Sequence, residues 1–276
     1  MNFLAKEPAD GNQKPLNILL TNDDGIDSMG VRSLIQSLGP YGRIWLATPS
    51  SQRSATSHGI TTRDVIPVQE VAIDGTEKAW HIGGLPADCV KLALIELIRE
   101  PIHLVISGIN EGSNLGTDTL YSGTVAAAVE GAYMGVPSLA ISLAQERGPW
   151  NFEPAAAICA HLVRRFQAGI FSIPPMSMIN INVPQGTLTD IKGYRAARLG
   201  VRRYTDYFQL HSEETGVRNY LLRGDIVPGD ASREPSAGEA DIDLVAKGYV
   251  SVAPISVDRT AFDLLNRLNG IMEEII

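Results

Sequence analysis

The stretch LNILLTNDDGIDS, residues 16–28, decides the fold class of this chain. Its apolar half suits a strand buried in a sheet, and the strand stops at two adjacent carboxylates, Asp23 and Asp24. Two neighbouring negative charges repel each other and favour neither a helix nor a strand. We therefore expect a cation to compensate them. The alternative is a turn held by side-chain hydrogen bonds, because NDDG is a good turn sequence without any ligand.

Three more apolar runs follow, at residues 43–48, 103–108 and 137–142, and they alternate with segments of helical period at residues 29–38, 86–98 and 122–134. Strands that are apolar throughout and separated by helices indicate a parallel sheet covered on both faces. We predict an α/β fold: a Rossmann-like, doubly wound, mostly parallel sheet core with an extended β arm and a C-terminal helix.

The composition and periodicity of the sequence change after about residue 184. Residues 191–216 are polar, basic and Tyr-rich with weak two-residue alternation, residues 238–256 contain strand-like runs, and residues 258–275 have helical period. We predict a flexible polar tail over residues 1–15, the Rossmann-like core over residues 16–184, and an extension over residues 185–276. Because the extension is in places too poor in apolar residues to fold alone, we expect it to contribute to an oligomer.

Composition excludes several function classes. The 276 residues carry 23 Lys plus Arg against 31 Asp plus Glu, a formal net charge of -8, so the surface as a whole should not attract nucleic acid or an anionic membrane. The sequence has no secretory leader and no apolar window of membrane-spanning length, which predicts a cytoplasmic protein. Cys89 and Cys159 lie far apart in apolar patterns and are predicted to be buried thiols.

Polar side chains follow three of the predicted strands. In open parallel sheets ligands bind beyond the carboxyl ends of the strands, so these side chains are expected to meet. Carboxylate, hydroxyl and amide oxygens without thiolates suit a hard divalent cation, Mg²⁺ or Mn²⁺, whereas zinc prefers imidazole or thiolate. The candidates at the three strand ends are Asp23 and Asp24, then Ser54 and His58, and finally Asn110 and Asn114.

A predicted helix opens with Ser122, Gly123 and Thr124. Free backbone N–H groups, two hydroxyls and the positive end of the helix dipole together form an anion site, and Gly123 permits close approach. The alternative is an ordinary helix cap with no ligand. An anion site beside a cation is the arrangement that a metal-dependent phosphatase requires.

Four ordered blocks of the sequence resemble the signature blocks of the SurE family, the metal-dependent 5′-nucleotidases known as stationary-phase survival proteins. They are ILLTNDDGI at 18–26, TPSSQRSATSHGIT at 48–61, GGLPADCVKLAL at 83–94 and VISGINEGSNLGTDTLYSGTVAAAVEG at 105–131. The late segment KGYVSVAPISVDRT at 247–260 is also similar. The resemblance implies a Rossmann-like core, an arm used in homodimer or homotetramer assembly, and hydrolysis of nucleoside monophosphates.

Carried over by motif, the resemblance implies one divalent metal per subunit and assigns two groups of residues. Leu85 stands where the family usually has Thr, and the 48–61 block lacks the family's usual acidic residue after the proline. These departures concern substrate preference and leave the metal and phosphate positions unchanged. The metal ligands would be Asp23, Asp24, Ser54 and Asn110, and the phosphate site would be lined by Asn114, Ser122, Gly123 and Thr124.

For the mechanism, Asp23 and Asp24 are the expected catalytic carboxylates, either of which could serve as base, and His58 is a candidate acid for the leaving ribose oxygen. A structural loop histidine is the alternative for His58. A haloacid-dehalogenase-like phosphatase and a non-catalytic metal-dependent nucleotide-binding module are the competing functions. The first needs D-x-D spacing, whereas Gly25 follows Asp24 here. The preferred nucleotide and metal, and dimer against tetramer, are left open.

Overall fold

The computed structural model describes residues 14–145, 149–230 and 238–273. The tail predicted for residues 1–15 falls almost entirely outside the described residues. None of the helices in the described part of the chain is long and apolar enough to cross a membrane.

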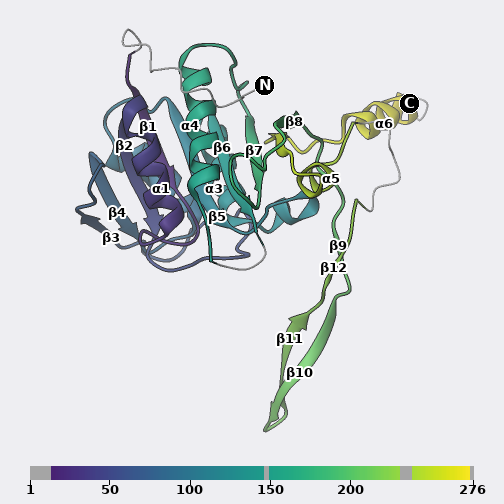
Figure 1. Cartoon of the computed structure of the whole chain (residues 1–276). Helices are drawn as coiled ribbons and strands as arrows, with labels where there is room; N and C mark the ends of the chain where they lie inside the picture. The colour runs from purple at the N-terminus through teal and green to yellow at the C-terminus, as the bar shows by residue number, and fades with distance from the viewer. Residues whose placement is uncertain (1–13, 146–148, 231–237, 274–276) are drawn as a thin grey trace.

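A nine-stranded sheet in the order β3-β4-β2-β1-β5-β6-β7-β13-β8 forms the body of the molecule (Figure 1). The six strands from β4 to β7 run parallel to one another, β3 is antiparallel to β4, and β13 is antiparallel to β7. This arrangement confirms the predicted α/β class with a mostly parallel sheet. The strands span β1 Leu16–Thr21, β2 Gly42–Pro49, β3 Val68–Val71, β4 Lys78–Ile82, β5 Leu104–Glu111, β6 Ser138–Ala144, β7 Ser177–Pro184, β8 Tyr194–Ala196 and β13 Val250–Ser256.

Helices cover both faces of the sheet. Along β1, Ile18 and Leu20 pack in one buried cluster with residues of α1 and α4, whereas Leu19 packs in another with residues of α2. Successive side chains of a strand point to opposite faces, so an apolar run is required when both faces are buried. The helices are α1 Met29–Leu38 and α4 Glu153–Gln167 on the first face, and α2 Pro86–Leu92, extended by a π-helical turn η2 Ala93–Leu97, and α3 Gly123–Tyr133 on the second.

Helix α1 shows how local sequence sets an element. The Ser28 hydroxyl accepts a hydrogen bond from the Gly30 backbone N–H at 3.2 Å and so caps the helix. Val31, Leu34 and Leu38 recur on one face of the helix and are fully buried. The helix therefore begins at a capping serine and lies on the sheet through its apolar stripe.

The region after residue 184 contributes to the main sheet. Strand β13 pairs with β7, and β8 pairs with β13, so two strands of the predicted extension complete the core sheet. Residues 241–246, expected to be strand-like, instead form the short helix α5 Asp241–Ala246. Here Ile242 and Leu244 are buried, and a run this short does not distinguish period two from helical period.

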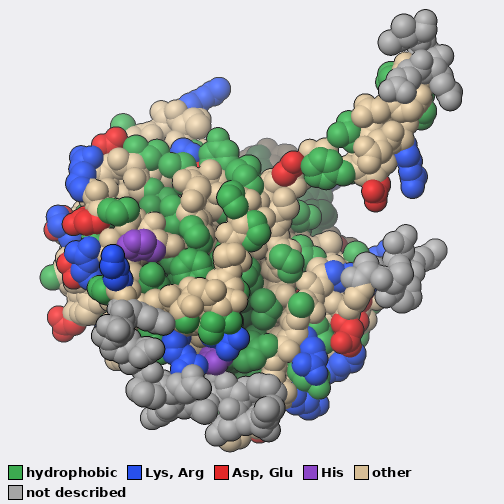
Figure 2. All heavy atoms as spheres, turned by 90° about the horizontal axis from the view of Figure 1, so that it is seen from above, with side chains coloured by type: hydrophobic (Ala, Val, Ile, Leu, Met, Phe, Trp, Pro, Cys, Tyr) green, Lys and Arg blue, Asp and Glu red, His purple; other side chains and the backbone are tan. Residues whose placement is uncertain are grey.

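The arm projects from the body (Figure 1), and the C-terminal helix projects from it as well (Figures 1 and 2). In the arm, β10 pairs with β11 and β9 pairs with β12, both antiparallel. Nearly every arm residue is exposed, as is the whole of α6 as far as its side chains are described. The spans are β9 Arg203–Tyr204, β10 Tyr207–Glu214, β11 Val217–Arg223, β12 Ile226–Val227 and α6 Phe262–Glu273, and two 3-10 turns lie at η1 Gly39–Tyr41 and η3 Gly116–Leu120.

Candidate active site

The carboxyl ends of β1, β2 and β5, which are neighbours in the sheet, meet at one cavity of about 560 Å³. Parallel strands bring their carboxyl ends to the same edge, which is why residues so far apart in the sequence converge. The cavity includes all four predicted metal ligands and two of the predicted phosphate residues. Its lining includes Asp23, Asp24, Ser54, Asn110, Asn114 and Ser122.

The turn after β1 does not depend on the two aspartates. The Asn22 side chain donates to the Gly25 carbonyl oxygen at 2.8 Å and accepts from the Gly25 backbone N–H at 3.1 Å. Asn22 is fully buried, so this pair of bonds closes the turn without help from solvent. The carboxylates of Asp23 and Asp24 are therefore free for another task, which weakens the turn-only interpretation of NDDG.

Asp23 is buried and is held by the start of α3. The Thr124 hydroxyl donates to Asp23 Oδ1 at 2.5 Å. A Cβ on Gly123 would lie 2.9 Å from Asp23 Oδ2, so only glycine lets the helix approach the carboxylate this closely. Burial raises the pKa of Asp23, although the hydrogen bond from Thr124 acts in the opposite direction.

Asp24 is half-buried and incompletely paired. Gln52 Nε2 donates to Asp24 Oδ1 at 3.3 Å, whereas Asp24 Oδ2 is buried and makes no hydrogen bond of normal geometry among the described residues. Burial, followed by the charges of Asp23 and Glu111, raises the pKa of Asp24 to about 6, although hydrogen bonding from the Gln52 side chain and the Glu111 backbone acts in the opposite direction. A buried carboxylate oxygen without a partner, repelled by two neighbouring carboxylates, is a position where a cation would be strongly favoured.

The remaining predicted ligands supply neutral oxygens. The Asn110 amide nitrogen donates to the Gly112 carbonyl oxygen at 2.9 Å, which leaves its amide oxygen available. Ser54 is exposed in the loop after β2, and the backbone N–H of the preceding Arg53 donates to the Asp23 carbonyl oxygen at 2.8 Å, tying this loop to the β1 turn. Within the described ranges no three or more His, Cys, Asp or Glu side chains group as a metal site. A few protein oxygens fit Mg²⁺ or Mn²⁺, which keep water ligands, better than zinc.

The anion half of the site lies at the start of α3. The Ser122 hydroxyl accepts from the Val125 backbone N–H at 3.1 Å, so this side chain is a helix cap as well as a cavity wall. The Asn114 amide donates one hydrogen to Ser142 Oγ at 2.8 Å, which leaves its second hydrogen for a ligand. The Asn114 backbone carbonyl oxygen accepts from the Asn182 side chain at 3.0 Å, so the loop that carries Asn114 is held from strand β7.

The Thr124 hydroxyl contacts a predicted metal ligand. The hydroxyl was expected to line a phosphate site, but it is fully buried and donates to Asp23. The strand-to-helix approach at Gly123 brings the two groups together, and a short charge-assisted hydrogen bond is stronger than one to a neutral acceptor. In the structure Thr124 positions a carboxylate and does not belong to the cavity lining.

His58 does not line the cavity with the aspartates. Its Nε2 lies 2.9 Å from Glu130 Oε2, and Lys91 Nζ donates to Glu130 Oε1 at 2.6 Å. Burial alone would raise the pKa of Glu130, but the hydrogen bonds from His58 and Lys91 outweigh it and lower the pKa. The catalytic assignment of His58 stays a prediction, and its observed partner favours the structural alternative.

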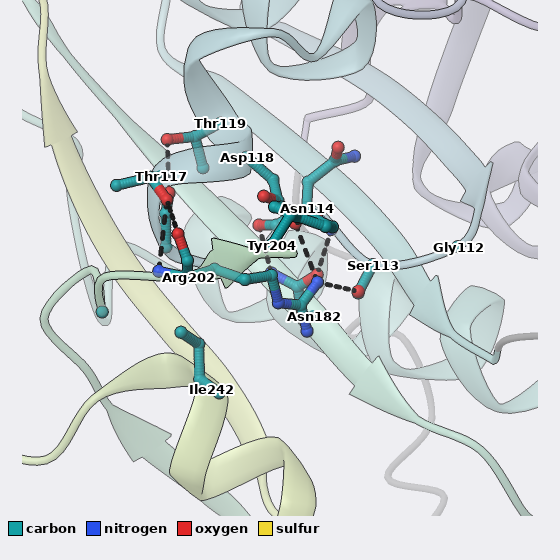
Figure 3. Close-up of polar contacts among 12 residues, drawn as sticks. Gly112, Ser113, Asn114, Thr117, Asp118, Thr119, Asn182, Arg202, Tyr204 and Ile242 are labelled. Carbon is teal, nitrogen blue, oxygen red and sulfur yellow. Dashed lines mark hydrogen bonds and ion pairs between the residues drawn. The ribbon is translucent and has the colours of Figure 1, made fainter. Parts of the chain in front are cut away.

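Several cavity residues were not singled out from the sequence. Glu111 directly follows a predicted ligand, so its position could have been inferred. Gln52 and Ala55 lie in the loop after β2, next to the predicted Ser54. The remaining residues lie on or directly after η3, or on the arm, where no local pattern connects them to the strand ends. They include Asp118, Tyr121, Tyr204, Asp206 and Leu222. Figure 3 shows Asp118 and Tyr204 close to Asn114, which places the arm root beside the strand-end site.

Comparison with known proteins agrees with the sequence motifs. The family described as Survival protein SurE matches residues 18–206. A protein named 5′-nucleotidase SurE from Syntrophomonas wolfei is 41% identical over 253 residues, covering 91% of this chain and 93% of the relative. A protein of the same name from Pseudothermotoga lettingae is 42% identical over 242 residues, covering 88% of this chain and 89% of the relative. The crystal structure of a SurE protein from Aquifex aeolicus matches with a TM-score of 0.76 and 32% identity, over 93% of this chain and 99% of that one. The resemblance drawn from the motifs is thereby confirmed.

Proposed function

The chain belongs to the SurE family, and on that premise we propose that it is a metal-dependent 5′-nucleotidase that hydrolyses nucleoside monophosphates to nucleoside and phosphate. The relatives compared above carry the name 5′-nucleotidase SurE and extend over most of this chain. The geometry of the strand-end cavity is independent support, because it brings the carboxylates of Asp23 and Asp24 together with Ser122 at the start of α3.

One observation carries the proposal. Asp24 Oδ2 is buried without a hydrogen bond of normal geometry among the described residues, and burial together with two further carboxylates, Asp23 and Glu111, raises the cost of its charge. Such an arrangement is unfavourable unless a cation is bound. We propose that one Mg²⁺ or Mn²⁺ per subunit is held by Asp23, Asp24, Ser54 and Asn110. When bound, the cation would act as a Lewis acid on a phosphate oxygen and lower the pKa of a bound water.

The chain's own residues would bind and orient the phosphate. The first turn of α3 directs backbone N–H groups and the positive end of its dipole toward the cavity edge at Ser122. The free amide hydrogen of Asn114 is a second donor. Donors that are fixed before the reaction stabilise negative charge without reorganising, and the hydrogen bonds around Asn114 and Ser122 hold these two in place.

We also propose a homo-oligomer, a homodimer or a homotetramer, formed through the arm. Large apolar side chains stand exposed along both arm strands, and exposed apolar surface of this kind marks an interaction site. Examples are Phe208 at 71% exposure and Leu222 at 59%.

A phosphate-release panel tests the function. Purified protein is incubated with each nucleoside monophosphate after chelation, and again after addition of Mg²⁺ or Mn²⁺. We expect release of inorganic phosphate only with a divalent cation. Isothermal titration with the metal alone should give about one site per subunit, and Asp24→Asn should remove that site.

Two outcomes would favour the alternatives. Metal-dependent binding of nucleotide without any phosphate release would identify a binding module. A covalent aspartyl phosphate, trapped by acid quench and found on Asp23 or Asp24 by mass spectrometry, would support the chemistry of the haloacid-dehalogenase-like enzymes.

His58→Gln separates the acid role from the structural one, since only the first predicts a changed pH profile of kcat.

A further inference from the structure

The residues described so far account for the phosphate end of a nucleotide and for none of its nucleoside. We propose that the root of the arm is the nucleoside subsite of this enzyme, with the ring of Tyr204 as the surface on which the base stacks. This inference rests on the proposed function. It adds a specificity-determining residue from a segment far from the catalytic strand ends in the sequence.

The first support is the extent of the cavity. Tyr204, Asp206 and Leu222 of the arm line the same cavity of about 560 Å³ as Asp24 and Asn110. Pockets for small organic ligands commonly measure about 300–1,000 Å³, so the volume suits a molecule much larger than phosphate. The lining from the strand ends is therefore oxygen-rich and acidic and would bind phosphate through a cation, whereas the lining from the arm offers an aromatic ring and an apolar side chain.

The second support is that Tyr204 is held in place before any ligand binds. Its hydroxyl donates to Asp118 Oδ2 at 2.8 Å, and Arg202 Nη1 donates to the same oxygen at 2.8 Å (Figure 3). The Arg202 and Asp118 side chains are only 11% and 17% exposed, so this ion pair is shielded from solvent. The Thr117 hydroxyl also donates to the Arg202 carbonyl oxygen at 2.8 Å, which fixes the backbone of the arm root to η3.

The hydrogen bond from the Tyr204 hydroxyl to Asp118 leaves part of the aromatic ring open for stacking. Although the hydroxyl is engaged, the residue remains 39% exposed, so part of the ring is open to a ligand. Asp206, two residues along, makes no side-chain hydrogen bond within the described ranges and is free to accept one from a ribose hydroxyl. Every base has a π face, so stacking on a tyrosine tolerates different bases. We expect the enzyme to accept several nucleoside monophosphates.

The test uses Tyr204→Leu, which keeps an apolar side chain and removes the ring. Tyr207→Leu is the matched control, because Tyr207 is an arm tyrosine, 59% exposed, that does not line the cavity. Steady-state kinetics are measured on a nucleoside monophosphate and on glycerol 3-phosphate, a phosphomonoester without a ring. Equilibrium binding of a hydrolysis-resistant nucleoside 5′-phosphonate is measured on the same proteins.

The expected result is a rise of about 10-fold or more in KM for the nucleotide in Tyr204→Leu, with kcat nearly unchanged, because base stacking contributes equally to ground and transition states. Phosphonate affinity should fall by a similar factor. Glycerol 3-phosphate hydrolysis and all properties of Tyr207→Leu should stay as in the wild type.

Three results would overturn the inference. An unchanged ratio of nucleotide to glycerol 3-phosphate kcat/KM in Tyr204→Leu would mean that the ring contributes nothing to the base, while the phosphatase function stands. An equal loss on both substrates would make Tyr204 a support of the catalytic residues instead. Equal loss of affinity in Tyr207→Leu would show a general effect of the arm. A different outcome would separate the two proposals. If the wild type binds the phosphonate but releases no phosphate, and Tyr204→Leu loses that binding, the subsite is upheld and the proposed function is overturned.

Discussion

The strand-end site and the arm are built in opposite ways. Strand β1 is buried on every residue except its first, and the polar side chains that follow it sit on a framework already stabilised by apolar packing on both faces. Strand β11 is exposed on every residue, and its partner β10 on all but one. The core thus carries polar groups inside apolar surroundings, whereas the arm carries apolar groups in solvent.

The contrast indicates where the core and the arm each obtain their stability. Burial of apolar area stabilises the core at roughly 25 cal/mol per Å², but a two-stranded ribbon without a covered face gains little. The arm therefore depends on whatever covers its exposed side chains. The two regions meet at the cavity, where Asp24 of the core and Tyr204 of the arm face the same space.

The largest expected effect comes from Asp24→Asn. This variant tests whether the partly buried charge of the Asp24 carboxylate is compensated by a bound cation. We expect turnover to fall on the order of 10³-fold or more, as for other members of a catalytic unit. Unfolding by denaturant after chelation should show equal or greater stability, because the substitution removes a carboxylate whose pKa is raised to about 6 by burial and by neighbouring charge. Asp27→Asn, at an 88% exposed side chain, is the control. Metal-dependent activity retained in Asp24→Asn would refute the assignment.

A smaller loss is expected from Thr124→Val, which tests whether the start of α3 supports the metal site. Since the hydroxyl is donated to Asp23, its removal should weaken metal affinity and turnover together, each by about 10- to 100-fold. Thr124→Ser keeps the donor and should restore both. Isothermal titration with Mn²⁺ and steady-state kinetics measure the two quantities. Turnover reduced with normal metal affinity would favour the alternative that the hydroxyl contacts phosphate directly.

Glu130→Gln tests the ion pairs that the buried Glu130 side chain makes with Lys91 and His58. Breaking the contacts to Lys91 and His58 should lower the free energy of unfolding by about 2 kcal/mol near neutral pH, since Glu130 is 2% exposed. The pKa of Glu130 is lowered in the folded protein from 4.5, so this stabilisation is present above about pH 4.5 and is lost as the pH falls through the lowered value.

The measurement is the difference in unfolding free energy between wild type and Glu130→Gln at several pH values. The exposed pair of Glu70 with Lys78, at 56% and 51% exposure, provides Glu70→Gln as a control with little expected effect. A difference that stays constant from pH 7 to pH 3 would contradict the ion-pair origin.

The smallest effect on folding is expected in the arm itself. Deleting residues 201–222 would lower the assembly state but would also remove Arg202 and Tyr204. A sharper variant is Phe208→Ser combined with Leu221→Ser, at 71% and 38% exposure. We expect a lower mass by light scattering and a change in unfolding free energy of the core below about 0.5 kcal/mol. Ile170→Ser, at 57% exposure away from the arm, should leave the mass unchanged. An unaltered mass in the arm variant would show that the oligomer forms elsewhere.

The sequence determined the elements whose signals are local. An apolar run predicts a strand buried on both faces, and the structure has β1 at residues 16–21 as expected. Helix α1 at residues 29–38 agrees with its predicted range, because a capping serine and an apolar stripe define it within a few turns. The motifs also identified the oxygen-bearing residues at three strand ends, since parallel strands bring such ends together whatever lies between them in the chain.

The tertiary structure alone decided which partner each side chain has. Thr124 donates to Asp23 across 101 positions in the sequence, His58 contacts Glu130 across 72, and Tyr204 donates to Asp118 across 86. Each contact requires that two packed elements approach at a particular distance, as α3 approaches β1 at Gly123. A periodic pattern records only which face of an element is buried and not what lies against it. For that reason the sequence could name the chemistry of the site, whereas the role of Thr124, the position of His58 and the reach of the arm into the cavity depended on packing.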